Sequence, residues 1–199
     1  VAIGIAPYVS RESIKARKVE ARLGGKLLDY DSSVYPRLKT RARDFYQRIK
    51  PSWGWNSRYW EQLALLELDA GNHTAAITYA QQAVVIESHP HTYTTLGHIL
   101  VKSATAARNE DEAQKLFCEG VEEFKRALEY AKRFKVIHAH THHAAIVGAI
   151  QFFKKWHLKV SDEQTTWVGD LFADAKMQFR DAFEWDSMKK QWDQLVGRT

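Results

Sequence analysis

The chain has 199 residues and a formal net charge of +5, and 45% of its residues are hydrophobic, including seven Trp, eight Tyr and nine Phe. This composition predicts a folded protein with a substantial core and excludes an intrinsically disordered chain. The single cysteine, Cys118, excludes an internal disulfide framework and fits a reducing, cytoplasmic compartment. No apolar run approaches the length of a membrane-spanning helix.

The positive charge lies in the N-terminal region. Residues 1–58 contain 13 Lys and Arg and 5 Asp and Glu, which leaves the rest of the chain with a net charge of −3. Such a stretch can contact phosphates, so nucleic-acid binding is one alternative. No aromatic residues interleave with the charges to stack on bases, and we favour a solvated helix face or a surface that docks on an acidic neighbouring domain. The basic residues concerned are Arg11, Lys15, Arg17, Lys18, Arg22 and Lys26.

Residues 1–56 are expected to form a basic connector followed by a capping helix. The start at Val1 suggests a piece of a longer protein, and residues 1–9 suit a short β-strand whose partner lies upstream or in another chain. Ser10 or Ser13 is placed to cap a basic helix that reaches about Arg22.

A second helix is expected over about residues 36–50, with Pro36 in its first turn. Pro51, Gly54 and Asn56 should break this helix, and a proline inside a helix removes a backbone hydrogen bond. Trp53 and Trp55 are then expected to wedge between the capping helix and the next helix.

Residues 60–90 carry the pattern of two amphipathic helices joined by a tight turn. Gly71 supplies a left-handed residue that ends the first helix, and Asn72 is placed as the N-cap of the second. Such a hairpin cannot bury both of its faces alone, so it needs neighbours. Its first helix has a face formed by Trp60, Leu63, Leu66 and Ala70, and its second carries the small residues Ala76, Ala80 and Ala83.

Further helices follow with local start signals. Asn109 with Glu112 resembles a capping box and begins a helix that reaches about Phe134. The next helix is expected near residues 136–156, and Ser161 with Gln164 forms another capping box. A buried stripe should then continue to Trp185, before a last helix from Asp186 to about Leu195. Members of this stripe are Trp167, Leu171, Phe172, Ala175, Phe179 and Ala182.

The helix pairs repeat in order along the chain. Trp60-x2-Leu63-Ala64 is followed 33 residues later by Tyr93-x2-Leu96-Gly97, and Ala76-x3-Ala80-x2-Ala83 is followed 44 residues later by Gly120-x3-Phe124-x2-Ala127. A more divergent third copy is Ala144-x2-Val147-Gly148, with Ala175-x3-Phe179-x2-Ala182 after it. The unequal spacings indicate an insertion between the helices of the second unit.

At these residues the chain resembles the tetratricopeptide repeat family, whose pattern is W-x2-L-G-x2-Y, then A-x3-F, then A and P. The resemblance implies an all-α fold, an α-solenoid of stacked antiparallel helical hairpins with N- and C-terminal capping helices. The chain departs from the family at Ala64, where Gly is preferred, and at Glu67, where Tyr is preferred. An irregular helical bundle is the alternative. The implied units are residues 57–89, 90–134 and 136–185, with a C-terminal capping helix at 186–199.

The resemblance also implies a binding surface. In the family, the first helix of each unit lines a concave face, and its second, fifth, ninth and twelfth positions meet the ligand. Glu61 and Leu65 replace the Lys and Asn of the family's clamp for C-terminal carboxylates, so an apolar helix is a better fit. The alternative is a groove filled by the chain's own terminal helices. The implied positions are Arg58, Glu61, Leu65 and Leu68; His91, Thr94, His98 and Val101; and His142, Ala145, Ala149 and Phe152.

A histidine cluster suggests a different chemistry. His138, His140, His142 and His143 resemble the H-x-H-x-D-H metal signature of the metallo-β-lactamase superfamily, with His142 in place of its Asp. In that family the motif follows a strand, and no strands are predicted around it here. On a helix only His138 and His142 share a face, and no acidic residue lies nearby in the sequence to complete a ligand set. We therefore expect no metal site and no other cofactor.

The sequence contains no phosphate-binding loop, dinucleotide fingerprint or nucleophile elbow, and nothing in it predicts an enzyme. The favoured hypothesis is a noncatalytic module that binds a protein or peptide segment, or other domains of the same longer cytoplasmic protein. The stretch from APYVSRES to NSRYWEQLALL also resembles the region that joins bacterial signalling or antiviral defence NTPases to their C-terminal repeats, which implies a sensor of foreign protein or nucleic acid. The rivals are a metal-dependent hydrolase using His138 to His143 and a nucleic-acid binder.

Overall fold

The computed structural model describes residues 36–136, 138–179 and 183–197. Within these ranges the secondary structure is helical and contains no strand, so the all-α prediction is confirmed for the described part of the chain. The predicted strand at residues 1–9 and the basic helix through Arg22 lie outside it. The helices are α2 (Pro36–Trp53), α3 (Ser57–Asp69), α4 (His73–Ile86), α5 (Pro90–Thr105), α6 (Glu110–Phe134), α7 (Ala139–Trp156), α8 (Asp162–Gln178) and α9 (Trp185–Val196).

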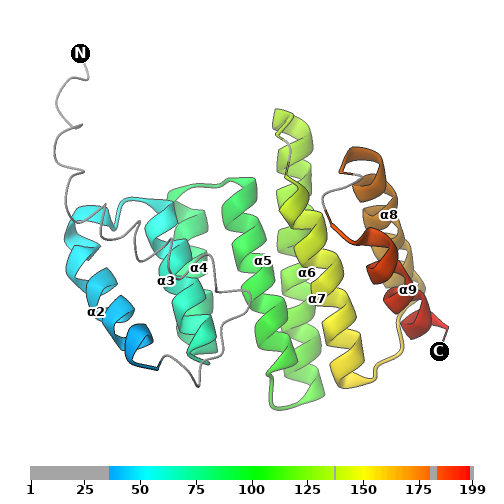
Figure 1. Cartoon of the computed structure of the whole chain (residues 1–199), viewed down its shortest axis with the longest axis horizontal. Coiled ribbons are helices and arrows are strands. Elements are labelled where there is room, and N and C mark those ends of the chain that lie inside the picture. The colour runs from blue at the N-terminus through cyan, green and yellow to red at the C-terminus, as the bar shows by residue number, and fades with distance from the viewer. Residues whose placement is uncertain (1–35, 137, 180–182, 198–199) are drawn as a thin grey trace.

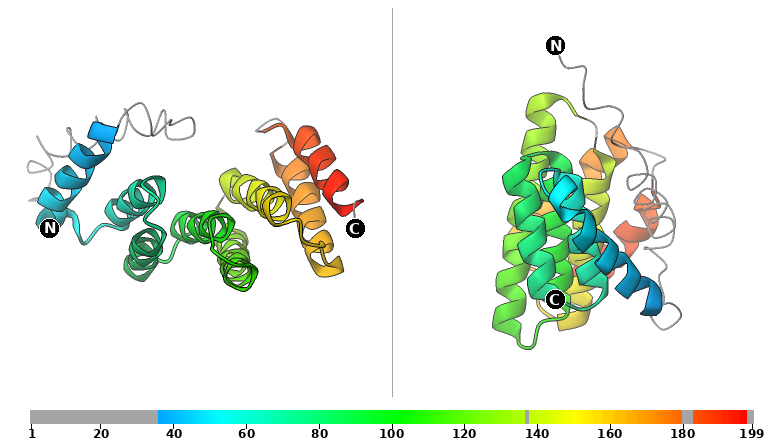
Figure 2. Two further views of the ribbon diagram at one scale, coloured as in Figure 1. Left: turned by 90° about the horizontal axis from the view of Figure 1, so that it is seen from below. Right: turned by 90° about the vertical axis from the view of Figure 1, so that its left-hand side faces the viewer.

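The helices lie side by side in chain order, with α2 at one end of the row and α8 and α9 at the other (Figure 1). Viewed along the helices, α3, α5 and α7 lie towards one face of the row, and α4 and α6 lie behind them (Figure 2). Helix α5 is the centre of the packing, because it contacts α3, α4, α6 and α7. The C-terminal helices α8 and α9 join the row through α7.

Local signals set most of the helix ends. Gly71 has a φ of 79°, the left-handed conformation that favours glycine, and it follows α3 as predicted. The Asn109 side chain accepts a hydrogen bond from Glu112 N at 2.9 Å and caps α6. Ser161 and Gln164 form the predicted capping box at the start of α8.

Two local predictions were wrong and one was met in position only. Pro51 lies inside α2, which continues to Trp53, because one missing hydrogen bond so close to the helix end does not break it. Asn72 is the N-cap of α4 as predicted, but its side chain makes no capping hydrogen bond, since its amide donates instead to Glu67 Oε2 at 2.6 Å. Trp55 does not wedge between helices; it is 70% exposed.

The C-terminal stripe also differs from the prediction. Helix α8 ends at Gln178, and Phe179 is its C-cap instead of a residue within it. Ala182 lies outside the described residues. The last helix begins at Trp185, within one residue of its predicted start.

Helix α2 is held on α3 by a pair of charge-assisted hydrogen bonds. Arg43 Nε and Nη2 donate to the two carboxylate oxygens of Glu67 at 2.6 and 2.8 Å. Burial raises the pKa of Glu67, but the hydrogen bonds from Arg43 and Asn72 outweigh it, so the pKa lies below its ordinary value. Glu67 therefore joins the first two described helices.

Close packing fixes the position of α5. A Cβ added at Gly97 would lie 2.9 Å from the backbone oxygen of Gly120 and 3.0 Å from the ring of Phe124, both on α6. A Cβ added at Gly148 of α7 would lie 2.8 Å from Val101 Cγ1. Glycine at these positions lets α6 and α7 approach α5 closely.

Candidate functional site

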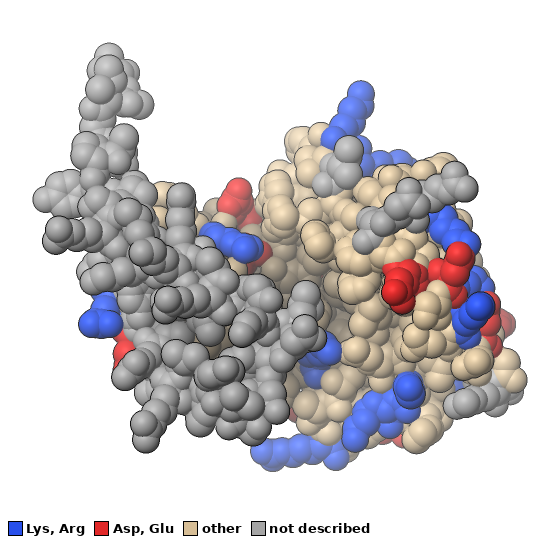
Figure 3. All heavy atoms as spheres, in the orientation of Figure 1, with Lys and Arg blue, Asp and Glu red and all other residues tan. Residues whose placement is uncertain are grey.

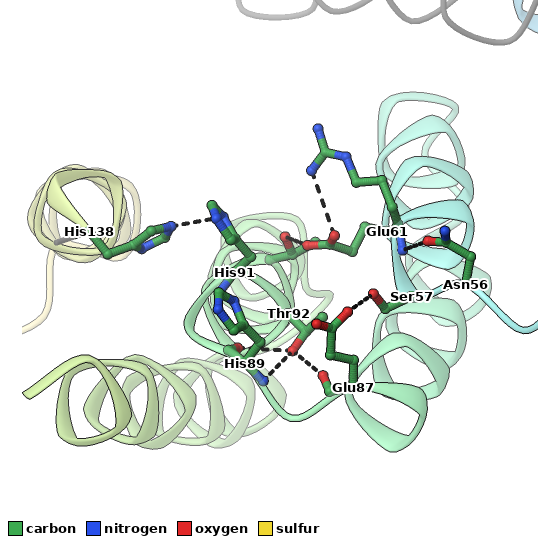
Figure 4. Close-up of polar contacts among 10 residues, drawn as sticks. Asn56, Ser57, Glu61, Glu87, His89, His91, Thr92 and His138 are labelled. Carbon is green, nitrogen blue, oxygen red and sulfur yellow. Dashed lines mark hydrogen bonds and ion pairs between the residues drawn. The ribbon is translucent and has the colours of Figure 1, made fainter. Parts of the chain in front are cut away.

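The N-terminal ends of α3, α5 and α7 lie at the same edge of the row (Figure 1), where polar side chains meet. Figure 4 shows the side chains at this edge: those of α3 and of the α4–α5 junction lie together, and His138 reaches towards His91 across the gap between α7 and α5. This edge, together with the face formed by α3, α5 and α7, is the candidate site.

Glu61 is the buried acidic residue of the α3 end, with only 3% of its surface exposed. Thr95 Oγ1 of α5 donates a hydrogen bond to Glu61 Oε1 at 2.7 Å. The guanidinium of Arg58 lies 3.6 Å from the other carboxylate oxygen. Glu61 thus ties α3 to α5 and has little surface left for a ligand.

The junction between α4 and α5 is closed in the same way. Ser57 at the start of α3 donates to the carboxylate of Glu87. His89 and Thr92 form a capping box at the start of α5, and Thr92 Oγ1 donates to the backbone oxygen of Glu87 at 2.7 Å. These contacts stabilise the start of α5.

Between α5 and α7 runs a chain of polar side chains, which we call the α5–α7 seam: His91, Thr94 and His98 of α5, His138 at the N-cap of α7, and Thr141 and His143 of α7. His138 Nε2 lies 2.8 Å from His91 Nδ1, and His138 Nδ1 lies 2.5 Å from Thr141 Oγ1. Thr141 in turn bonds Thr94, with 2.7 Å between the hydroxyl oxygens.

The seam disfavours positive charge on its imidazoles. Burial, together with the neighbouring His91 and His140, lowers the pKa of His138 to about 4. Burial also lowers the pKa of His98 to about 4, with help from Lys102 and His143. These side chains are therefore neutral at pH 7.

His91 and His143 follow the same trend. Burial lowers the pKa of His91, although Glu61 opposes the change. Burial also lowers the pKa of His143, whose ring stacks on Phe183 with 4.2 Å between centroids.

His142 faces away from the seam, towards α8. Its Nε2 lies 2.8 Å from Asp174 Oδ2, and its ring meets the ring of Phe179 edge-on. Its Nδ1 is buried and has no hydrogen-bond partner. Sequence analysis missed Asp174, which lies 32 residues further along the chain; the only available signal was a polar residue beside the apolar stripe of α8.

A cavity of about 690 Å³ opens between α6, α7 and α8, and both His138 and His142 line it. Lys132 and Lys135 contribute basic groups from α6, and Asp174 contributes an acidic group from α8. A second cavity of about 780 Å³ lies between the α3–α4 and α5–α6 turns, where His73 Nδ1 lies 3.1 Å from Ser103 Oγ. Neither cavity lies on the face formed by α3, α5 and α7.

The histidines that resemble a metal signature point towards different partners. His138 contacts α5, His142 contacts Asp174 of α8, and His143 stacks on Phe183. Among the described residues, no three His, Cys, Asp or Glu side chains come together as a metal ion would require. His138 lies at the N-cap of α7, outside the helical conformation, so it does not share a face with His142. His142 and His143 are adjacent within the helix and therefore point in different directions.

The residues predicted to bind a ligand divide into two groups. Arg58 and His91 are exposed, and Leu65 and His98 are half-buried, so these four offer surface on the α3–α5–α7 face. Glu61, Thr94 and His142 are buried and bonded within the chain. Whether any of the seven binds a ligand stays a prediction.

Five further positions were predicted to line the groove, and one of them, Leu68, is half-buried. The prediction was wrong for the other four, because close packing of α7 on α5 and α6 places them in the core, where they cannot line an open groove. These residues are Val101, Ala145, Ala149 and Phe152.

Comparison with protein-family models, curated proteins and solved structures finds no match for this chain. None of the helices in the described ranges is long and apolar enough to cross a membrane. A function for the chain therefore has to be inferred from the arrangement of its own side chains.

Proposed function

We propose that this chain is a noncatalytic helical-repeat module, of the tetratricopeptide type, that binds a protein segment on its α3–α5–α7 face. The module would belong to a longer cytoplasmic protein of the bacterial signalling or defence kind, with α2 and α9 as its caps. The alignment of α3, α5 and α7 on one face carries the proposal (Figure 2), because a segment laid across this face would contact each helix in turn.

The contacts within the first two hairpins support a repeat. Ala64 of α3 shares a core cluster with Ala76 and Ala80 of α4. The corresponding residue of the second unit, Gly97, lies against Gly120 and Phe124 of α6. The small residue of the first helix thus meets the equivalent residues of the second helix in both units.

The exposed part of the face suits a segment with apolar side chains. In the part of this face that is visible in the middle of Figure 3, most of the described surface is neither basic nor acidic. Leu65 of α3 and Val147 of α7 are both half-buried and leave part of their apolar surface accessible, while Arg58 and His91 add hydrogen-bond donors. An amphipathic helix or an extended peptide with one apolar edge would match these groups.

A noncatalytic role is supported by the way the polar groups are used. Glu61 of α3 is bonded to Thr95 of α5. His138 and Thr141 at the start of α7 are bonded to His91 and Thr94 of α5, so these contacts hold α3, α5 and α7 together. Such closed pairs stabilise a scaffold, whereas a general acid or base needs to reach a substrate.

A peptide-display library selected against the whole chain tests this proposal. We expect selected peptides to bind wild type and to lose at least tenfold in affinity with Arg58→Glu and with Gln151→Glu, two exposed positions on α3 and α7. Val85→Ser on α4, behind the face, is the matched control and should leave affinity unchanged. Failure to select any peptide, or equal losses in all three variants, would rule the binding face out.

A further inference from the structure

The two ends of the contact between α5 and α7 have different chemistry. At the N-terminal end, the helices meet through the hydrogen-bonded side chains of the α5–α7 seam. At the C-terminal end, Val101 packs against Gly148, and Trp156 Nε1 donates to the backbone oxygen of Ala104 at 3.0 Å. A fall in pH can therefore weaken the contact at the N-terminal end, where histidines titrate, and leaves the contacts of Val101 and Trp156 at the C-terminal end unchanged.

The hydrogen bond between His91 and His138 limits how many protons the pair can carry. One of the two facing nitrogens has to accept, so at least one of these rings keeps an unprotonated nitrogen. A single added proton preserves the bond and can reside on the exposed ring of His91, beside Glu61, while His138 stays neutral. Protonation of His138 itself would place an imidazolium on a side chain that is only 7% exposed. A second proton leaves two donors facing each other, and the bond is lost.

The surroundings offer little to balance such a charge. Towards His91, α3 presents Arg58 and Glu61, and α5 adds His89; Glu61 is already bonded to Thr95.

Helices α6, α7 and α8 complete the surroundings of His138. Helix α7 adds His140 and His142, and the shared cavity brings Glu129, Lys132 and Lys135 from α6 and Asp174 from α8. Asp174 is bonded to His142 and Gln178. The cavity therefore carries charges of both signs, and the groups that lower the pKa of His138 beside its burial are the neighbouring imidazoles.

We propose that the α5–α7 seam is an acid-operated hinge, in which protonation of His138 and His91 parts the N-terminal halves of α5 and α7 while the contacts around Val101 and Gly148 hold. Opening exposes Thr94 and Thr141 and tilts α7 to α9 away from α2 to α6. This hinge does not depend on the binding function proposed above.

The size of the effect follows from proton linkage. The pKa of His138 is about 4 in the closed seam against an ordinary value of 6.5, so the closed form is favoured above pH 6.5 and loses this advantage as the pH falls towards 4. Between pH 7.5 and pH 4.5 the population of the open form should rise about 70-fold from His138 alone.

Hydrogen exchange on the whole chain, corrected for the intrinsic rate at each pH, tests the hinge. In wild type we expect protection at residues 90–98 and 139–146 to fall by at least about 70-fold between pH 7.5 and pH 4.5, with little change at 99–105 and 147–156. His138→Gln keeps an amide that can bond His91 and Thr141 but does not titrate, so it should reduce the fall by about the 70-fold that His138 contributes. What remains is the share of His98, the other seam histidine with a pKa of about 4. His157→Asn, at an exposed position at the end of α7, is the matched control and should behave as wild type.

Each outcome decides the proposal. An equal loss of protection at both ends of the helices would overturn it, as would a fall of undiminished size in His138→Gln or its disappearance in His157→Asn. If His138→Gln does not fold, His138→Asn removes the same titrating group with an amide that suits the N-cap position of α7, and it carries the same expectation.

Discussion

Helices α5 and α6 approach each other at small residues, whereas α6, α7 and α9 meet through aromatic rings. Gly97 lies against the backbone of Gly120 in the first region. In the second, Phe152 of α7 stacks on Phe117 of α6 with 4.1 Å between ring centroids, and Phe153 meets Trp192 of α9 at 5.9 Å. The two regions belong to one row of helices, but different kinds of side chain pack between their helices.

The difference explains why the repeat pattern is clear in one region and divergent in the other. Backbone contact at a glycine permits essentially one helix separation, so the residue type is tightly constrained. Aromatic rings can fill spaces of several shapes, and hydrophobic side chains of similar volume replace one another at small cost. The region from α7 to α9 can therefore keep a core without keeping the repeat positions.

The largest effect is expected in the aromatic region. Phe152→Ala removes a ring that is 1% exposed and stacked on Phe117, and should lower the free energy of unfolding by about 3–5 kcal/mol through the cavity it leaves. Chemical denaturation at pH 7 measures this. A loss below about 1 kcal/mol would mean that the rings do not form the core of this region.

A smaller effect is expected where α2 joins α3. Arg43→Ala leaves the Glu67 carboxylate buried with only Asn72 as a partner, and should cost about 2 kcal/mol at pH 7. The folded-state pKa of Glu67 lies below its ordinary value of 4.5, so the ion pair contributes fully above that pH and its contribution is lost as the pH falls below it.

Denaturation of wild type and Arg43→Ala at pH 7 and at pH 3 should therefore show a stability difference that shrinks with acid. Arg48→Ala, at an exposed position on the same helix, is the control and should change stability little at either pH. A difference that stays constant with pH would contradict the assignment of Glu67 as the partner.

Sequence analysis succeeded where the deciding signal was local. Gly71, Asn109 and Ser161 mark helix ends through contacts within a few residues. It could not find the pairs of Arg43 with Glu67 and of His142 with Asp174, which join residues 24 and 32 positions apart. Helical periodicity says which face a residue occupies but not which residue of another helix it meets.

The candidate site illustrates the same limit. The family pattern placed Arg58 and His91 on an accessible face, as the structure has them. It also placed Val101 and Ala145 on that face, where close packing of α7 against α5 and α6 buries both. The depth of contact between units depends on side chains from two helices at once, and a rule written for one helix does not contain it.

The central claim is that close contact at small residues aligns α5 with its neighbours and so forms the α3–α5–α7 face. The most direct measurement is the free energy of unfolding of Gly97→Leu beside that of Gly169→Leu, since an added Cβ meets Gly120 and Phe124 at Gly97 but nothing within 4 Å at Gly169. We predict a loss of about 1–3 kcal/mol for Gly97→Leu from overpacking, and no loss for Gly169→Leu because glycine is a poor helix former. Equal effects of the two substitutions would contradict the close approach of α5 and α6, and with it the alignment of the face.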